Sequence, residues 1–193
     1  MKILKGLWKF LKNVGAQLHR FVLWTLILIF FWGWIYTFVG DTTRAKKVMI
    51  YVDAYELDGQ TLTERLEDMG LPEGIKMIQV RSFANHLVSS TIEGDVYVIR
   101  ESMLLSALEE TPGKLMPIGI PAGFTGYEWE GETWGVRVYD ASTGTGVASD
   151  CILYALINGP EPENYYLCFD AKSPHLEDGA VWQVVMNLLS LDD

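Results

Sequence analysis

The stretch "GDVYVIRESMLLSAL", residues 94 to 108, decides the fold. Residues 95–99 form a run of β-branched and aromatic side chains, which is typical of a buried strand. Residues 102–110 then read as a helix in which Ser102 is the expected N-cap. A strand that passes directly into a helix is the repeating unit of an α/β sheet.

The sequence before this stretch repeats the same alternation. Residues 48–52 and 76–80 are predicted strands, and a helix is predicted between them within residues 58–70. Thr61 and Glu64 have the spacing of a capping box at the start of that helix. This order predicts an α/β domain with a mostly parallel sheet, arranged as one three-layer-like lobe.

The pattern changes after residue 113. The chain is punctuated by glycine and proline, and residues 127–140 then predict a hairpin with its turn near Glu130 and Gly131. A further strand is predicted over residues 164–170, and apolar residues at helical spacing predict a closing amphipathic helix over 181–189. The hairpin is therefore expected beside the parallel part of the sheet.

Residues 21–40 contain no charged side chain. Twenty helical residues rise about 30 Å, the thickness of a bilayer's hydrocarbon core, so this segment is predicted to be a transmembrane helix and an uncleaved signal anchor. Residues 1–20 are expected to be a cytoplasmic basic amphipathic segment, or alternatively only a long positive flank. A linker over 41–47 and an extracytoplasmic α/β domain over 48–193 complete the expected organisation.

The charges on either side of residues 21–40 predict the orientation. All five charged residues before the segment are basic, which places the N-terminus in the cytoplasm. Ten basic and all 25 acidic residues follow residue 40, so the outer part carries a net charge of −15. Such a charge argues against nucleic acid as a partner, because phosphates would be repelled. The expected partners are the lipid bilayer and either a membrane protein or a second copy of the chain.

The sequence favours binding over catalysis. Cys151 lacks the arginine and the preceding strand motif of a sortase-like site, and no G-x-S-x-G nucleophile elbow occurs. His86 and His175 stand apart, without the clustered partners that a zinc site needs. No catalytic residue, metal or cofactor is therefore predicted. Cys151 and Cys168 either pair in a disulfide or act as small buried hydrophobic residues.

The candidate ligand contacts lie at two places. Polar residues follow the predicted strands, at the edge where open α/β sheets bind ligands, and two tryptophans lie in the hairpin, where exposed rings stack on sugars or apolar partners. Each place also has a structural interpretation, namely an ion pair at a helix start and rings that fill the core. The predicted contacts are Asn85, His86, Glu101, Ser102, Trp129 and Trp134.

The order of these pieces resembles extracellular solute-binding proteins of the ABC-transporter type. The similar parts are "KVMIYVDAYELDGQTLTERLED", "GDVYVIRESMLLSALE" and the hairpin "YEWEGETWGVRVYD", although Arg137 stands where that family usually has proline. The resemblance implies a lobe whose ligands bind in a cleft against a second lobe. Only 153 of the 193 residues follow residue 40, which suffices for one lobe.

Together, these observations predict a single-pass, membrane-anchored extracytoplasmic binding domain that is not an enzyme and is accessory to transport or sensing. With half a cleft, capture of a small molecule would need a dimer or a partner lobe. The alternative is a structural or assembly protein of the cell envelope without a small-molecule ligand.

Overall fold

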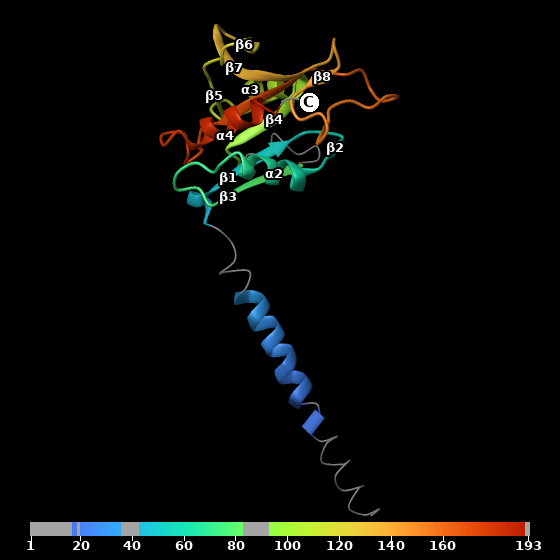
Figure 1. The fold of residues 1–193 in the computed structure, drawn as a ribbon, viewed down its shortest axis with the longest axis vertical. Coiled ribbons are helices and arrows are strands. Elements are labelled where there is room, and N and C mark those ends of the chain that lie inside the picture. Colours follow the sequence, from blue (N-terminus) through green and yellow to red (C-terminus); the bar gives the residue numbers. More distant parts are fainter. Residues whose placement is uncertain (1–16, 19, 36–42, 83–92, 192–193) are drawn as a thin grey trace, which may run out of the picture. The chain divides into compact units, whose positions relative to one another are not determined.

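The computed structural model describes residues 17–18, 20–35, 43–82 and 93–191, and they fall into two compact units, Met1–Thr42 and Thr43–Asp193 (Figure 1). Most of the predicted basic segment over 1–20 lies outside the described residues. The second unit closes its own core, since every buried hydrophobic side chain among the described residues lies between Val48 and Leu189.

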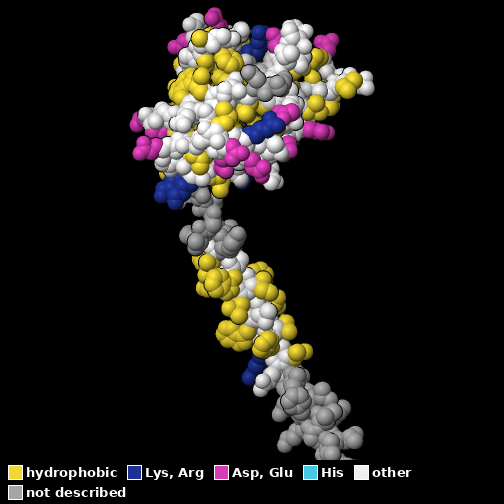
Figure 2. All heavy atoms as spheres, in the orientation of Figure 1, with side chains coloured by type: hydrophobic (Ala, Val, Ile, Leu, Met, Phe, Trp, Pro, Cys, Tyr) yellow, Lys and Arg dark blue, Asp and Glu magenta, His cyan; other side chains and the backbone are white. Residues whose placement is uncertain are grey.

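In the first unit, residues 20–35 form a helix whose large apolar side chains are exposed all round. Phe21 is 77% exposed and Phe30 is 76% exposed, and Figure 2 shows hydrophobic side chains along this helix. Within the described residues, no helix is both long and apolar enough to cross a membrane. Residues 36–40 of the predicted transmembrane segment lie outside that part of the chain.

The second unit has mixed α/β structure, which confirms the predicted fold class. The 3₁₀-helix η1 (Arg44–Lys46) is its first element, and a loop cluster over residues 141–164 carries two of its short strands. The strands are β1 (Lys47–Val52), β2 (Glu56–Leu57), β3 (Met77–Ser82), β4 (Val96–Arg100), β5 (Leu115–Met116), β6 (Gly126–Trp129), β7 (Glu132–Asp140), β8 (Thr145–Gly146), β9 (Ile152–Leu153) and β10 (Tyr165–Asp170). The helices are α2 (Gly59–Asp68), α3 (Glu101–Glu110) and α4 (Ala180–Leu189).

The main sheet is mixed, so the prediction of a mostly parallel sheet is wrong. Its strands follow the order β3-β1-β4-β10-β7-β6, with β5 beside β10 and β8 beside β7. Among the described strands, only β3, β1 and β4 pair in parallel. The reason is β10, which returns late in the chain and inserts antiparallel between β4 and β7. The predicted β6–β7 hairpin is confirmed, and Glu130 and Gly131 both have the positive φ of a tight hairpin turn.

Helices cover both faces of the sheet, as the predicted three-layer lobe requires. Side chains alternate along each strand, so Val96 and Val98 of β4 join the larger core, to which α2 and α4 contribute. Tyr97 and Ile99 point to the other face and join a smaller core with Leu104 of α3. All six residues of β10 are buried, because both faces of the sheet are covered.

The two cysteines do not form a disulfide. Cys151 belongs to the larger core and Cys168 to the smaller one, so they lie on opposite faces of the sheet. Burial raises the pKa of both thiols. Both cysteines therefore act as small hydrophobic residues, the second of the two interpretations that the sequence allowed.

Helix α2 begins with a different cap from the one predicted. The Asp58 side chain accepts a hydrogen bond from the Thr61 N–H at 3.0 Å, so Asp58 is the N-cap and Thr61 is inside the helix. The same helix protects the edge of the sheet, because Glu67 and Thr63 accept hydrogen bonds from the outward N–H groups of Ile78 and Val80 in β3.

Candidate functional site

The carboxyl ends of β1 and β4 meet at one edge of the sheet, where polar residues were predicted to gather. Asp53 directly follows β1, and its backbone N–H donates to the Val98 carbonyl at 2.8 Å. Arg100 ends β4, and its Nε lies 2.7 Å from Asp53 Oδ2. The Asp53 side chain is 8% exposed and that of Arg100 is 26% exposed. The hydrogen bond to Asp53 raises the pKa of the Arg100 guanidinium, so Arg100 keeps its positive charge.

Glu101 and Ser102 lie beside this pair but are held by other residues. Asn164 Nδ2 donates to Glu101 Oε2 at 2.9 Å, and the Glu101 N–H donates to the Asn164 carbonyl at 2.9 Å. Glu163 accepts a hydrogen bond from the Ser102 N–H at 3.0 Å. The first turn of α3 is therefore capped by a distant carboxylate, and the predicted N-cap role of Ser102 is wrong.

Two tyrosines line the neighbouring strands on the face of Glu101. The Tyr127 and Tyr166 rings meet edge to face, with centroids 5.2 Å apart. Burial raises the pKa of both phenols, and the negative charge of Glu101 raises them further. Both rings are therefore neutral, and they form an apolar wall beside the carboxylate.

The structure separates the predicted tryptophans from Glu101. Tyr165 pairs with both Arg100 and Tyr139, which places Tyr139 at the edge of the sheet that carries Arg100. Trp134 lies five residues earlier in β7, about 16 Å along a strand that rises about 3.3 Å per residue. The Trp134 indole packs on the smaller core and donates to the Trp129 carbonyl at 3.2 Å.

The six predicted contacts therefore do not form one site. Glu101 and Ser102 are neighbours at one edge, whereas Trp129 and Trp134 lie toward the other edge. Asn85 and His86 lie outside the described residues.

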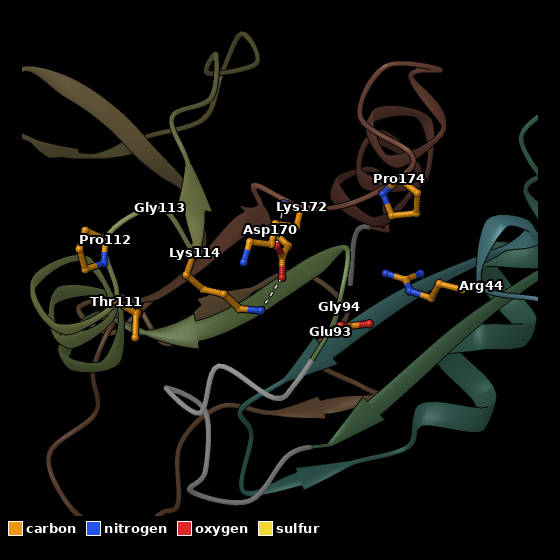
Figure 3. A pocket seen from close by; sticks show the side chains of 10 residues that line it. All are labelled: Arg44, Glu93, Gly94, Thr111, Pro112, Gly113, Lys114, Asp170, Lys172 and Pro174. Carbon is orange, nitrogen blue, oxygen red and sulfur yellow. Dashed lines mark hydrogen bonds and ion pairs between the residues drawn. The ribbon is translucent and has the colours of Figure 1, made fainter.

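A charged pocket that sequence reasoning missed lies at the opposite edge of the sheet, where β1 and β4 begin. It has a volume of about 420 Å³, and Arg44, Lys114 and Lys172 contribute basic side chains to its lining (Figure 3). Asp170, which ends β10, is 2% exposed. Its carboxylate accepts hydrogen bonds from Tyr97 Oη and Lys114 Nζ, each at 2.6 Å. Burial, followed by the bond to Asp170, raises the pKa of the Tyr97 phenol.

The sequence signal for this pocket is an acidic residue next to an apolar strand. Asp95 precedes β4 in "GDVYV" and Asp170 ends β10 in "YYLCFD". In the sequence, such residues look like ordinary turn residues. Only the antiparallel pairing of β10 with β4 brings the two aspartates together, and the Asp170 N–H then donates to the Asp95 carbonyl at 3.0 Å.

Both edges of the sheet carry ion pairs, Arg100 with Asp53 at one edge and Lys114 with Asp170 at the other. Within the described residues, no group of three or more His, Cys, Asp or Glu side chains is placed to hold a metal ion. The raised pKa of the Cys151 thiol disfavours the thiolate that a nucleophile needs.

Comparisons with protein-family models, curated proteins and solved structures find no match to this chain.

Proposed function

We propose that this protein is a membrane-tethered extracytoplasmic binding domain that does not catalyse a reaction and that acts as an accessory or sensing component. The observation that carries the proposal is the division of the chain into an apolar helix with exposed side chains and a separate domain that closes its own core. Residues 21–35 of that helix carry no charge, and an exposed apolar surface of this kind needs lipid or a partner to cover it.

The binding surface in this proposal is the edge that carries Arg100. The two-stranded ribbon of β2 and β9 extends this edge, because Tyr55 follows Asp53 and its N–H donates to the Leu153 carbonyl at 3.0 Å. Exposed apolar side chains gather on the ribbon and the loop after it: Tyr55 and Leu153 are each 37% exposed, Leu156 is 42% exposed, and Ile157 is fully exposed. Apolar residues exposed next to one another favour a contact surface.

The resemblance to one lobe of a solute-binding protein agrees with this surface. In the described fold, β10 returns directly to the sheet after β7, so residues 141–164 form loops and short strands on the same lobe. A single lobe offers half a cleft, and its ligand would be enclosed only by a partner protein or a second copy.

The second candidate is a structural or assembly protein of the cell envelope. It is favoured by the pairing of the polar groups at the same edge, where Arg100 bonds to Asp53 and Glu101 to Asn164. A domain whose edge groups satisfy one another has no polar group there that awaits a small ligand.

A thermal-shift screen of the full chain in lipid nanodiscs, against sugars, amino acids and peptides, separates the two candidates. A ligand that binds only the folded state raises its melting temperature. The binding proposal predicts a shift that disappears in Glu101→Ala and persists in Trp134→Ala, since these residues lie at opposite ends of the sheet. A folded protein that shows no shift with any probe contradicts ligand capture and leaves the structural candidate.

A further inference from the structure

Arg44, the first residue of η1, is held by a buried carboxylate. Its Nη1 lies 2.6 Å from Asp95 Oδ2 and its Nη2 lies 2.7 Å from Asp95 Oδ1, a two-pronged geometry. The Asp95 side chain is fully buried, and that of Arg44 is 30% exposed. Charge-assisted forks of this kind are among the strongest hydrogen bonds in proteins and the most demanding in geometry.

Asp95 joins three segments of the domain at this point. Besides the Arg44 fork, its carboxylate accepts the Met49 N–H of β1 at 2.7 Å and the hydroxyl of Ser173, which follows β10. A buried carboxylate is tolerated only when it is paired and hydrogen-bonded. Arg44 supplies the positive charge in this network, so the core of the domain depends on a residue that precedes its first strand.

The main chain of Arg44 is held as well. The Arg44 carbonyl lies 3.2 Å from His175 Nε2, and this imidazole is 2% exposed. A carbonyl only accepts, so Nε2 is the donor in this contact. His175 is itself fixed, because its N–H donates to Ser173 Oγ at 3.2 Å and its Nδ1 lies 3.4 Å from Asp178 Oδ2.

Arg44 lies three residues before β1, where the preceding chain enters the domain. Lys47 begins β1, an inner strand that pairs with β3 on one side and with β4 on the other. Any motion or pull that reaches residue 43 through the preceding chain passes Arg44 before it reaches β1. Arg44 Nη1 also donates to the Lys47 carbonyl at 2.9 Å, at the start of β1. Its contacts with Asp95 and His175 would pass such a pull into the start of β4 and the loop after β10 as well, so β1 would not carry it alone.

We propose that Arg44 is a clamp that holds the end of the tether in the domain and spreads motions of the tether over β1, the start of β4 and the loop after β10. This inference rests on the proposed function for the existence of a membrane tether. The pocket in Figure 3 lies beside the clamp and is open to solvent. The Arg44 side chain lines it on one side and the Lys114 side chain on the other.

The test is hydrogen exchange of the full chain in nanodiscs, with Arg44→Lys as the main variant. Lysine keeps the positive charge beside Asp95 but lacks the fork that reaches both carboxylate oxygens. We expect amides of residues 44–49 to exchange about tenfold faster, the change that the loss of one charge-assisted hydrogen bond produces. Amides of β10 should keep their wild-type rates, because this change is a local opening.

Arg65→Lys is the matched control. Arg65 also bonds to an aspartate, Asp150, but both side chains are largely exposed, so residues 44–49 should exchange at the wild-type rate. If Arg44→Lys does not fold, the double variant Arg44→Gln/Asp95→Asn removes both charges of the pair, and it should fold and show the same fast exchange. Wild-type exchange at 44–49 in a folded Arg44 variant, or equal acceleration in β10, overturns the clamp.

Flotation of the full chain with liposomes tests the tether separately. A chain that does not float with the lipid overturns the membrane tether. The exchange contrast between Arg44→Lys and Arg65→Lys is still measurable in that case, because every clamp contact lies within the second unit. Failure of the clamp and failure of the proposed function therefore give different results.

Discussion

Replacement of Tyr97 by phenylalanine tests the buried charges at the edge where β4 begins. The Tyr97 hydroxyl donates to Asp170 Oδ2 at 2.6 Å and accepts the Gly94 N–H at 3.0 Å, and the side chain is 1% exposed. A hydrogen bond to a charged group contributes about 1.5–3 kcal/mol. Asp170 keeps Lys114 and the Lys172 N–H, so we expect a loss of about 2 kcal/mol in the free energy of unfolding.

For a domain of this size, that loss lowers the melting temperature by about 4–8 °C. Urea unfolding and calorimetry of the second unit measure both quantities. Tyr127→Phe is the control, because the Tyr127 ring packs on Tyr166 and its hydroxyl makes no hydrogen bond within the described residues. It should change stability by less than about 0.5 kcal/mol. Equal losses in the two variants would refute the reasoning, since the network around Asp170 would then contribute nothing beyond ring packing.

Three further predictions concern other buried or capped groups of the domain. The free energy of unfolding should fall as the pH rises above about 10. Tyrosines of the unfolded chain ionise there, whereas burial raises the pKa of Tyr97 and Tyr165 in the folded state. In a pH series of urea midpoints, Tyr97→Phe should make this decline less steep. Glu163→Ala removes the cap of α3 and should cost about 1 kcal/mol, seen as a melting temperature lower by about 2–4 °C, whereas an unchanged value would mean that water replaces the cap. Cys151 and Cys168 should stay unreactive toward a thiol reagent until the domain unfolds, and reductant should leave the melting temperature unchanged; rapid labelling of either in the folded protein would contradict their burial.

Local patterns predicted most elements of the fold. The apolar run of β4, the helical spacing of α4 and the tight turn at Glu130 and Gly131 all depend on residues close in sequence. The order of the sheet depends on a long-range pairing, that of β10 with β4, and alternation in the sequence does not encode the partner of a strand. For the same reason a mostly parallel sheet was predicted, whereas five of the seven strand pairings described in the main sheet are antiparallel.

The candidate site was predicted only in part. Glu101 and Ser102 lie at the expected edge, because the end of β4 follows from its sequence. Their partners Glu163 and Asn164 come from a loop some 60 residues later, which no local signal links to α3. The tryptophans were predicted as a second place of contact in the hairpin, and their distance from Glu101 follows from the direction of β7 relative to β4, which the sequence does not give.

The central claim is that a folded domain outside the cytoplasm is carried by an apolar anchor. The most direct test is an Ile157→Cys variant of the full chain, treated in intact cells with a thiol reagent that does not cross membranes, followed by alkaline extraction of the membranes. Ile157 is fully exposed and both native cysteines are buried, so labelling reports this position alone. The account predicts a labelled protein that stays with the membranes. Labelling only after lysis, or release of the protein into the soluble fraction, would contradict it.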